Sequence, residues 1–184
     1  MSARLADSDI TTLWVVPGGI ADINAGPTVT ELESALNITC AVVEGYELGM
    51  TASDARDSAR SVCDQGNVTE FGAANYAGNL TFLREGDVEA VENDSAYLRA
   101  AGFFDDRNKR FDLVRRGAVP DSVESIKSHD EDAVEGDMVE VYGFVTDYPQ
   151  YRSGQNANSD ATFTVPLGQQ SRFNTRVAVQ AAGV

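Results

Sequence analysis

Positive charge is scarce in this chain of 184 residues. Lys and Arg together number 14, against 29 Asp and Glu, and the formal net charge is −15. Lys109 and Lys127 are the only lysines. A surface that grips nucleic acid must neutralise phosphates and is therefore basic, and adhesion to anionic lipid has the same requirement. The composition argues against both functions.

Cysteine and histidine are almost absent. Cys40, Cys63 and His129 are the only such residues, so neither a disulfide scaffold nor a typical zinc site is expected. Cys40 falls in an apolar run, which predicts a small buried side chain. His129 falls in an acidic stretch, where a solvated side chain is favoured over a catalytic base, because no G-x-S-x-G elbow accompanies it. Walker and G-x-G-x-x-G loops are also missing, so we expect no cofactor and no enzymatic activity.

Long hydrophobic runs are missing as well. No run approaches the length of a membrane span. Residues 1–9 are polar and charged, where a signal peptide would carry an apolar segment. These absences predict a protein that is assembled in the cytoplasm and has no membrane partner.

What the chain has instead is a series of short alternating segments. Hydrophobic residues make up 42% of the sequence, enough for a folded core. A helix over 29–36 is predicted behind a capping box of Thr28 and Glu31, and a second helix over 94–101 before Gly102. Strands are predicted over 13–16, 38–43, 79–85, 111–116 and 138–148, and a closing hairpin over 162–166 and 172–180 with its turn at 167–170.

This pattern predicts a mainly β fold, an antiparallel sandwich or barrel with short helices at its flank. No linker divides the chain, so residues 1–184 are expected to form a single domain. Within it we expect a polar N-terminal arm over 1–12 and long loops over about 44–78 and 150–161.

The predicted strand over 138–148 is apolar on both faces. Val139, Val141 and Val145 occupy one set of alternating positions, and Met138, Tyr142 and Phe144 lie in the other. A strand of this kind is usually buried on both sides. Either a neighbouring subunit or a helix of the same chain covers the second face. The candidate interface residues are Trp14, Val139, Val141, Tyr142, Phe144 and Val145.

Several segments follow one another in a characteristic order. Leu-Trp-Val-Val-Pro at 13–17 precedes Ile-Ala-Asp at 20–22, and the helix start at 27–32 leads into Ile-Thr-Cys at 38–40. The strand at 80–82, the long strand at 139–145 and Phe-Thr-Val-Pro at 163–166 complete the series. Taken together, and covering most of the chain, these segments resemble the tail tube (major tail) proteins of long-tailed, siphovirus-type bacteriophages.

The resemblance implies a non-enzymatic structural role in the tail of the virion. Such proteins form hexameric rings that stack into a hollow tube, with the inner strands of six subunits joined into one β-barrel around the lumen. The implied partners are further copies of the chain and the tape measure, tail terminator and distal tail proteins, and viral DNA passes through during ejection. Assembly takes place in the host cytoplasm, and segments 1–12, 52–72 and 150–161 are the expected bridges between rings.

The acidic composition acquires a mechanical meaning in such a tube. Carboxylates along the lumen repel DNA phosphates and let the DNA slide, whereas a basic lumen would trap it. For any single residue, an external position that keeps subunits soluble is an equal alternative. The candidate lumen-facing residues are Glu85, Asp87, Asp112, Glu140 and Asp147.

Three other functions stay open at this point. A tail terminator or baseplate component would form one ring and would not polymerise. A ligand- or glycan-binding β-sandwich would carry clustered aromatics in exposed loops, where this chain offers Tyr148 and Tyr151. A hydrolase is the weakest alternative, because no carboxylate pair stands out. The acidic run at 130–137 lacks EF-hand spacing, so a solvated loop is favoured over a weak cation site.

Overall fold

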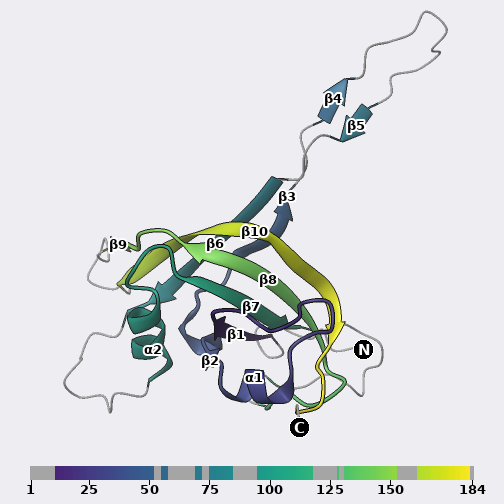
Figure 1. The fold of residues 1–184 in the computed structure, drawn as a ribbon. Coiled ribbons are helices and arrows are strands. Elements are labelled where there is room, and N and C mark those ends of the chain that lie inside the picture. Colours follow the sequence, from purple (N-terminus) through teal and green to yellow (C-terminus); the bar gives the residue numbers. More distant parts are fainter. Residues whose placement is uncertain are drawn as a thin grey trace, which may run out of the picture.

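One antiparallel sheet organises the molecule (Figure 1). The computed structural model describes residues 11–51, 55–57, 69–71, 75–84, 95–117, 128, 131–152 and 161–182. The eight-stranded sheet has the order β2-β1-β7-β8-β10-β6-β3, with β9 also paired to β10. Its strands are β1 (Thr12–Pro17), β2 (Leu36–Asn37), β3 (Glu47–Thr51), β6 (Asn75–Leu83), β7 (Arg110–Arg116), β8 (Met138–Thr146), β9 (Gln150–Arg152) and β10 (Thr162–Ala178). The predicted mainly β class is confirmed.

The sheet curls until its two edges are bridged by a single stretch of chain, residues 36–51. This stretch pairs with β1 through β2 and then forms the 3-10 helix η2 (Thr39–Ala41). It reaches the other edge where Val42 bridges Phe82, and it continues along β6 as β3. The result is a partly closed barrel with an interior of its own.

The barrel interior is an aromatic core. Phe82 stacks on Phe163 with ring centroids 4.9 Å apart and lies 4.8 Å from Phe104. Phe111 and Phe144 extend the cluster from β7 and β8. The helix α2 (Ala96–Phe103), capped by the Ser95 hydroxyl, contributes its buried Ala100 to this core. Buried aromatic side chains of this size dominate the hydrophobic stabilisation of a small domain.

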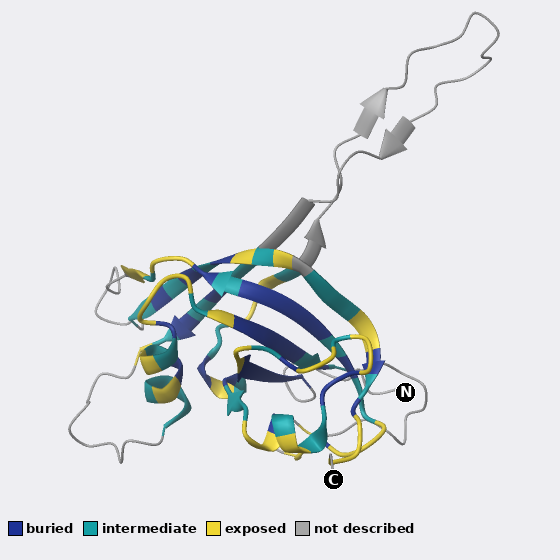
Figure 2. Ribbon diagram, viewed as in Figure 1, coloured by how far each residue is buried: buried dark blue, intermediate teal, exposed yellow. Residues whose placement is uncertain are grey.

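A second core lies on the outer face of β1, β7 and β8. Because side chains alternate along a strand, Trp14 and Val16 of β1 point away from the barrel interior, as do Val139 and Val141 of β8. The helix α1 (Val29–Glu33) covers them through Leu32, together with Ile20, Ala133, Val177 and Val179. Burial on both faces makes β7 and β8 dark blue through the middle of Figure 2.

The predicted closing hairpin is wrong. Residues 162–178 form one continuous strand, β10, and the expected turn at 167–170 lies inside it. Residues Thr162 to Pro166 pair with β6, and Leu167 to Ala178 pair with β8. The expected Gln-rich turn at 167–170 begins at the point where the strand changes partners, from β6 to β8.

The predicted strand over 38–43 and the burial of Cys40 are also wrong. The Asn37 side-chain oxygen accepts hydrogen bonds from the Thr39 amide (3.0 Å) and the Thr39 hydroxyl (2.7 Å), which winds the chain into η2. Such local side-chain bonds compete with strand pairing. In the helical turn Ile38 and Ala41 point inward, and Cys40 between them is exposed.

Both predicted helices exist with shifted ends. The capping box is present, because the Glu31 amide donates to the Thr28 hydroxyl at 3.2 Å and the Thr28 amide donates to Glu31 at 2.8 Å. α1 ends at Glu33, and Leu36 enters β2 instead. α2 passes through Gly102 to Phe103.

The segment predicted as a long loop over 44–78 contains a two-stranded arm. β3 and β6 remain paired from Glu47↔Asn79 to Thr51↔Asn75, beyond the last contact of β6 with β10. β4 (Ala55–Asp57) and β5 (Thr69–Phe71) pair farther out, so the arm projects from the barrel (Figure 1). Thr12, expected in the N-terminal arm, is completely buried in β1.

Candidate assembly surfaces

Asp112 is buried and holds a loop in place. It lies on β7, is 3% exposed, and accepts a hydrogen bond from the Ile20 amide at 2.8 Å. Arg172 of β10 lies 3.0 Å from the same carboxylate oxygen and also donates to the Ile20 carbonyl. Burial raises the pKa of Asp112, although the Ile20 amide and Arg172 oppose this effect. In the single chain this candidate lumen carboxylate points into the protein.

Glu140 is neutralised by a neighbour. Its carboxylate lies 2.5 Å from the Arg115 guanidinium on the adjacent strand β7, and its side chain is 20% exposed. Burial and the negative charge of Glu140 raise the pKa of Tyr142 to about 12. The ion pair therefore sits in a partly dehydrated environment and contributes no net charge to the surface.

Asp147 is the one exposed carboxylate among the three candidate lumen residues that the structure describes. Its side chain is 61% exposed and lies 3.9 Å from Arg107. Glu85 and Asp87 lie outside the described residues. Whether any of these carboxylates faces a lumen stays a prediction, because a lumen requires further subunits.

The candidate interface residues are covered by their own chain. Five of the six, Trp14, Val139, Val141, Tyr142 and Phe144, are at most 5% exposed, and Val145 is half-buried. α1 and the segments around it provide the cover on the outer face. This coverage accounts for the two-faced apolar pattern of β8 without a neighbour. The interface role of these residues stays a prediction.

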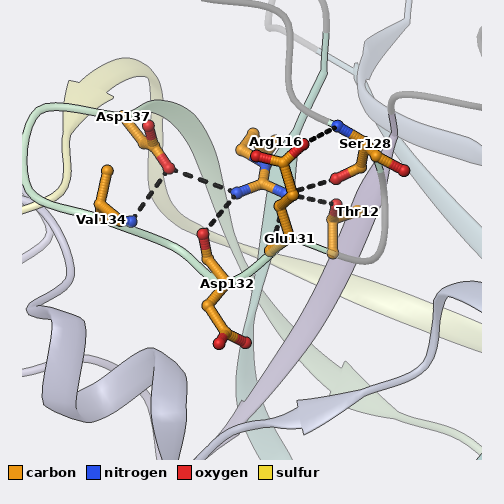
Figure 3. A network of polar contacts seen from close by, with 7 residues as sticks. All are labelled: Thr12, Arg116, Ser128, Glu131, Asp132, Val134 and Asp137. Carbon is orange, nitrogen blue, oxygen red and sulfur yellow. Dashed lines mark hydrogen bonds and ion pairs between the residues drawn. The ribbon is translucent and has the colours of Figure 1, made fainter.

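Arg116 organises the acidic loop, which we define as residues 131–137 (Figure 3). Its guanidinium, with 6% of the side chain exposed, donates to the carbonyls of Ser128, Glu131 and Asp132 at 2.6–3.2 Å. It also contacts the Asp137 carboxylate at 3.3 Å and the Thr12 hydroxyl at 3.2 Å. One buried cation thus fastens the loop to β1.

Among the described residues, the most exposed large hydrophobic side chains are not among the candidate interface residues. Val134, Tyr148 and Tyr151 are 48%, 61% and 57% exposed. Tyr148 ends the predicted strand over 138–148, but β8 stops at Thr146, so Tyr148 lies in the exposed segment that follows. Val134 in the acidic loop and Tyr151 in the short strand β9 belong to no long alternating pattern that could select them.

The described residues form neither a cluster of metal ligands nor a membrane-spanning helix. No three metal-ligating side chains come together in the part of the chain that the structure describes. Within that part, no helix has the length and apolarity needed to cross a bilayer. A surface cavity of about 350 Å³ is lined by Thr11, Leu13, Thr39, Val42, Glu44, Gly45 and Tyr46, none of which supplies a histidine, cysteine or lysine.

The described residues form a partly closed antiparallel barrel with one core inside it, a second core on its outer face and a projecting arm, which defines a mainly β protein. The chain belongs to the phage tail tube protein family, whose model matches residues 1–182. Its fold is similar to that of a chain in the cryo-EM structure of the anti-feeding prophage (AFP) baseplate, 6-fold symmetrised, with a TM-score of 0.51 and 12% sequence identity. That similarity covers 95% of this chain and 98% of the other. No curated protein sequence matches. The chain is a structural component of a phage tail.

Proposed function

We propose that this chain forms hexameric rings that stack into the hollow tail tube of a long-tailed, siphovirus-type phage, the conduit for DNA ejection. The observation that carries the proposal is the family match, which leaves only the last two residues of the chain uncovered. The baseplate structure with a similar fold is six-fold symmetrised, which supports the choice of six subunits. The role is structural, without enzymatic activity. Partners are further copies and the tape measure, terminator and distal tail proteins, met in the host cytoplasm.

The sheet supplies a strand for such a ring. Over Leu167–Gln169, β10 pairs with β8 on one side, and no described strand pairs with the other side of this stretch. A stretch of strand without a neighbouring strand is a template for another strand. Closing six sheets into one barrel removes these edges, because a closed barrel has none.

The arm formed by β3 and β6 supplies a bridge between rings. It leaves the barrel past β10 and carries the β4–β5 pair beyond it. A segment that makes few contacts with its own barrel gains stability when it packs on a neighbour. The predicted bridge over 52–72 falls in this arm.

The net charge of −15 favours sliding of DNA in such a tube. Asp147 is the exposed candidate among the described carboxylates, and Glu85 and Asp87 remain candidates by sequence. Asp112 and Glu140 face the lumen only if assembly uncovers them.

Electron microscopy of the purified chain tests the proposal, with samples dilute and concentrated at low and high salt. Hollow tubes of uniform width are expected. A matched variant replaces residues 52–74 with an Asn-Gly turn between Thr51 and Asn75, which are paired in the arm. This variant should give rings that do not stack. Wild-type rings that never stack would favour the single-ring terminator or baseplate role, and persistent single particles would contradict assembly by the chain alone.

A further inference from the structure

The three most exposed large hydrophobic side chains lie at opposite ends of β8. Val134 precedes the strand, and Tyr148 and Tyr151 follow it. β8 has nine residues, which separate the two ends by about 30 Å. Each end therefore presents its own surface, and one chain cannot bring the two together.

The end after β8 combines aromatic rings with guanidinium groups. Arg107 lies over the Tyr148 ring at 4.9 Å, and Arg84 lies over the Tyr151 ring at 5.2 Å. We call Arg84, Arg107, Tyr148 and Tyr151 the tyrosine–arginine end. Tyrosine and arginine are the residue types enriched at the energetic centres of protein interfaces. The exposed pair of Arg107 with Asp147, at 3.9 Å, is weak enough to be exchanged for another carboxylate.

The end before β8 is the acidic loop. Asp132 and Glu135 are exposed on either side of Val134. Three sets of hydrogen bonds fix the loop backbone. Arg116 donates to its carbonyls, the Val134 amide donates to the Asp137 carboxylate at 3.0 Å, and the Gly136 amide donates to the Val179 carbonyl at 2.9 Å. A surface that is ordered before binding loses less entropy when it docks.

We propose that the tyrosine–arginine end of one copy docks on the acidic loop of the next copy, head to tail. The inference rests on the proposed function and names the surfaces that join copies in stacked rings. Val134 inserts between the two tyrosine rings, while Asp132 and Glu135 meet Arg84 and Arg107. A second copy is the occupant because both complementary surfaces belong to the same chain. Two different patches that bind each other form a heterologous contact, which repeats from copy to copy instead of closing in a two-fold dimer and gives an open filament where successive copies do not close into a ring.

Charge reversal tests the contact. One variant carries Arg84→Glu and Arg107→Glu, the second carries Asp132→Lys and Glu135→Lys, and a third carries all four changes. Each of the first two should raise the concentration needed for stacking by about tenfold or more, because like charges then face each other. The third should stack as the wild type does, and so should an equimolar mixture of the first two. The control Glu33→Lys with Glu44→Lys changes the net charge as the second variant does, at exposed positions outside both proposed surfaces and outside the arm.

Sedimentation velocity and electron microscopy read the outcome, and thermal unfolding confirms that every variant is folded. The inference is overturned if either two-residue variant stacks at the wild-type concentration, or if the folded four-residue variant and the mixture both fail to regain stacking. In those cases wild-type tubes still form and the proposed function stands. If the wild type forms neither rings nor tubes, the proposed function itself fails and the inference falls with it.

Discussion

At the scale of single residues, a few charged side chains are buried, and each needs partners that offset the free energy of its desolvation. Arg116 is enclosed by three carbonyls, the Asp137 carboxylate and the face of Trp14, whose ring centre lies 5.1 Å from the guanidinium carbon. A buried cation is tolerated only when its donors are met. Most of these partners come from β1 and the acidic loop, so the burial of Arg116 and the ordered conformation of that loop depend on each other.

Replacing Arg116 by Met should therefore destabilise the fold by about 3 kcal/mol. The change removes the cation beside Asp137, which is 13% exposed, and removes one donor from each of three carbonyls. Urea unfolding measures the loss. The matched change Arg107→Met, at an exposed position, should alter stability by no more than about 0.5 kcal/mol. Equal effects of the two changes would show that the buried network is not stabilising.

The contribution of Asp112 to the free energy of unfolding should depend on pH with the opposite sign to that of a carboxylate in a surface salt bridge. Its pKa in the folded protein is raised above 3.8 by burial, so the folded state binds the proton more tightly than the unfolded state. Its contribution to stability therefore falls as pH rises from about 3.8 through the folded pKa. Asp112→Asn removes this effect, and the Asn side-chain oxygen can still accept from the Ile20 amide.

The free energy of unfolding of Asp112→Asn, relative to that of the wild type, should thus increase between pH 4 and pH 7, so that the variant becomes relatively more stable. Urea titrations across this range measure it. Asp147→Asn, at an exposed site, serves as the control for the loss of one carboxylate. A relative stability of Asp112→Asn that falls as pH rises would mean that the ion pair with Arg172 outweighs burial.

At the scale of elements, one glycine on β8 leaves room for an ion pair between side chains of β7 and β10. Gly143 of β8 lies between Asp112 and Arg172, and a Cβ atom there would approach the Arg172 carbonyl oxygen to 2.9 Å and the Asp112 carboxylate to 3.2 Å. A backbone atom on β10 cannot yield as a side-chain tip can. The absence of a side chain at Gly143 is thus a condition for the ion pair.

Gly143→Ala should cost about 1–3 kcal/mol by overpacking. The comparison is Gly168→Ala in β10, where a Cβ would meet the Val145 methyl group at 3.1 Å, a contact that can relax. That change should be close to neutral, because alanine has a lower conformational entropy than glycine in the unfolded chain. Thermal and urea unfolding of both variants compare the two sites. Similar losses would contradict a specific role for Gly143.

The elements that the sequence predicted well are those whose signal is local. The strand around Trp14, the strand at 138–146 and the capping box of Thr28 and Glu31 each follow from neighbouring residues, and all three are present. The alternation in β8 also predicted burial of both faces. What covers the outer face, α1 with the segments around it, depends on contacts distant in sequence, and the sequence left it open.

The elements that the sequence predicted wrongly depend on partners. Pro166 and Gly168 are ordinary turn residues, yet β10 continues through them because β6 and β8 pair with it in succession. At 38–43 the apolar run favours a strand, but Asn37 and Thr39 form side-chain bonds that set a helical turn. For the surfaces, the sequence selected apolar residues of β1 and β8 that the chain buries itself. Tyr148 falls inside the predicted strand over 138–148 but beyond the observed end of β8 at Thr146, and the exposed Tyr151 and Val134 have no periodic signal.

At the scale of the whole molecule, net charge and local contacts oppose each other during assembly. Each chain contributes −15, so in the proposed tube a ring of six would carry −90 and successive rings would repel one another. The proposed contacts between the acidic loop and the tyrosine–arginine end are attractive but short in range. Which effect dominates decides how assembly responds to salt.

We expect assembly to strengthen as NaCl rises from about 20 mM to 500 mM, over which the screening length shrinks from about 20 Å to about 4 Å. Repulsion between charges spread over whole rings acts over distances longer than the screening length, so salt weakens it strongly. The proposed charge pairs are in contact around an apolar centre of Val134 and the tyrosines, so salt weakens their attraction less. The concentration at which half of the chain sediments as tubes should fall over this range. The variant Asp132→Lys with Glu135→Lys reduces the net charge from −15 to −11. The concentration at which its rings form should therefore depend less on NaCl, although these rings need a higher concentration than the wild type to stack. Assembly of the wild type that weakens steadily with salt would show that the contact pairs outweigh the repulsion of the rings.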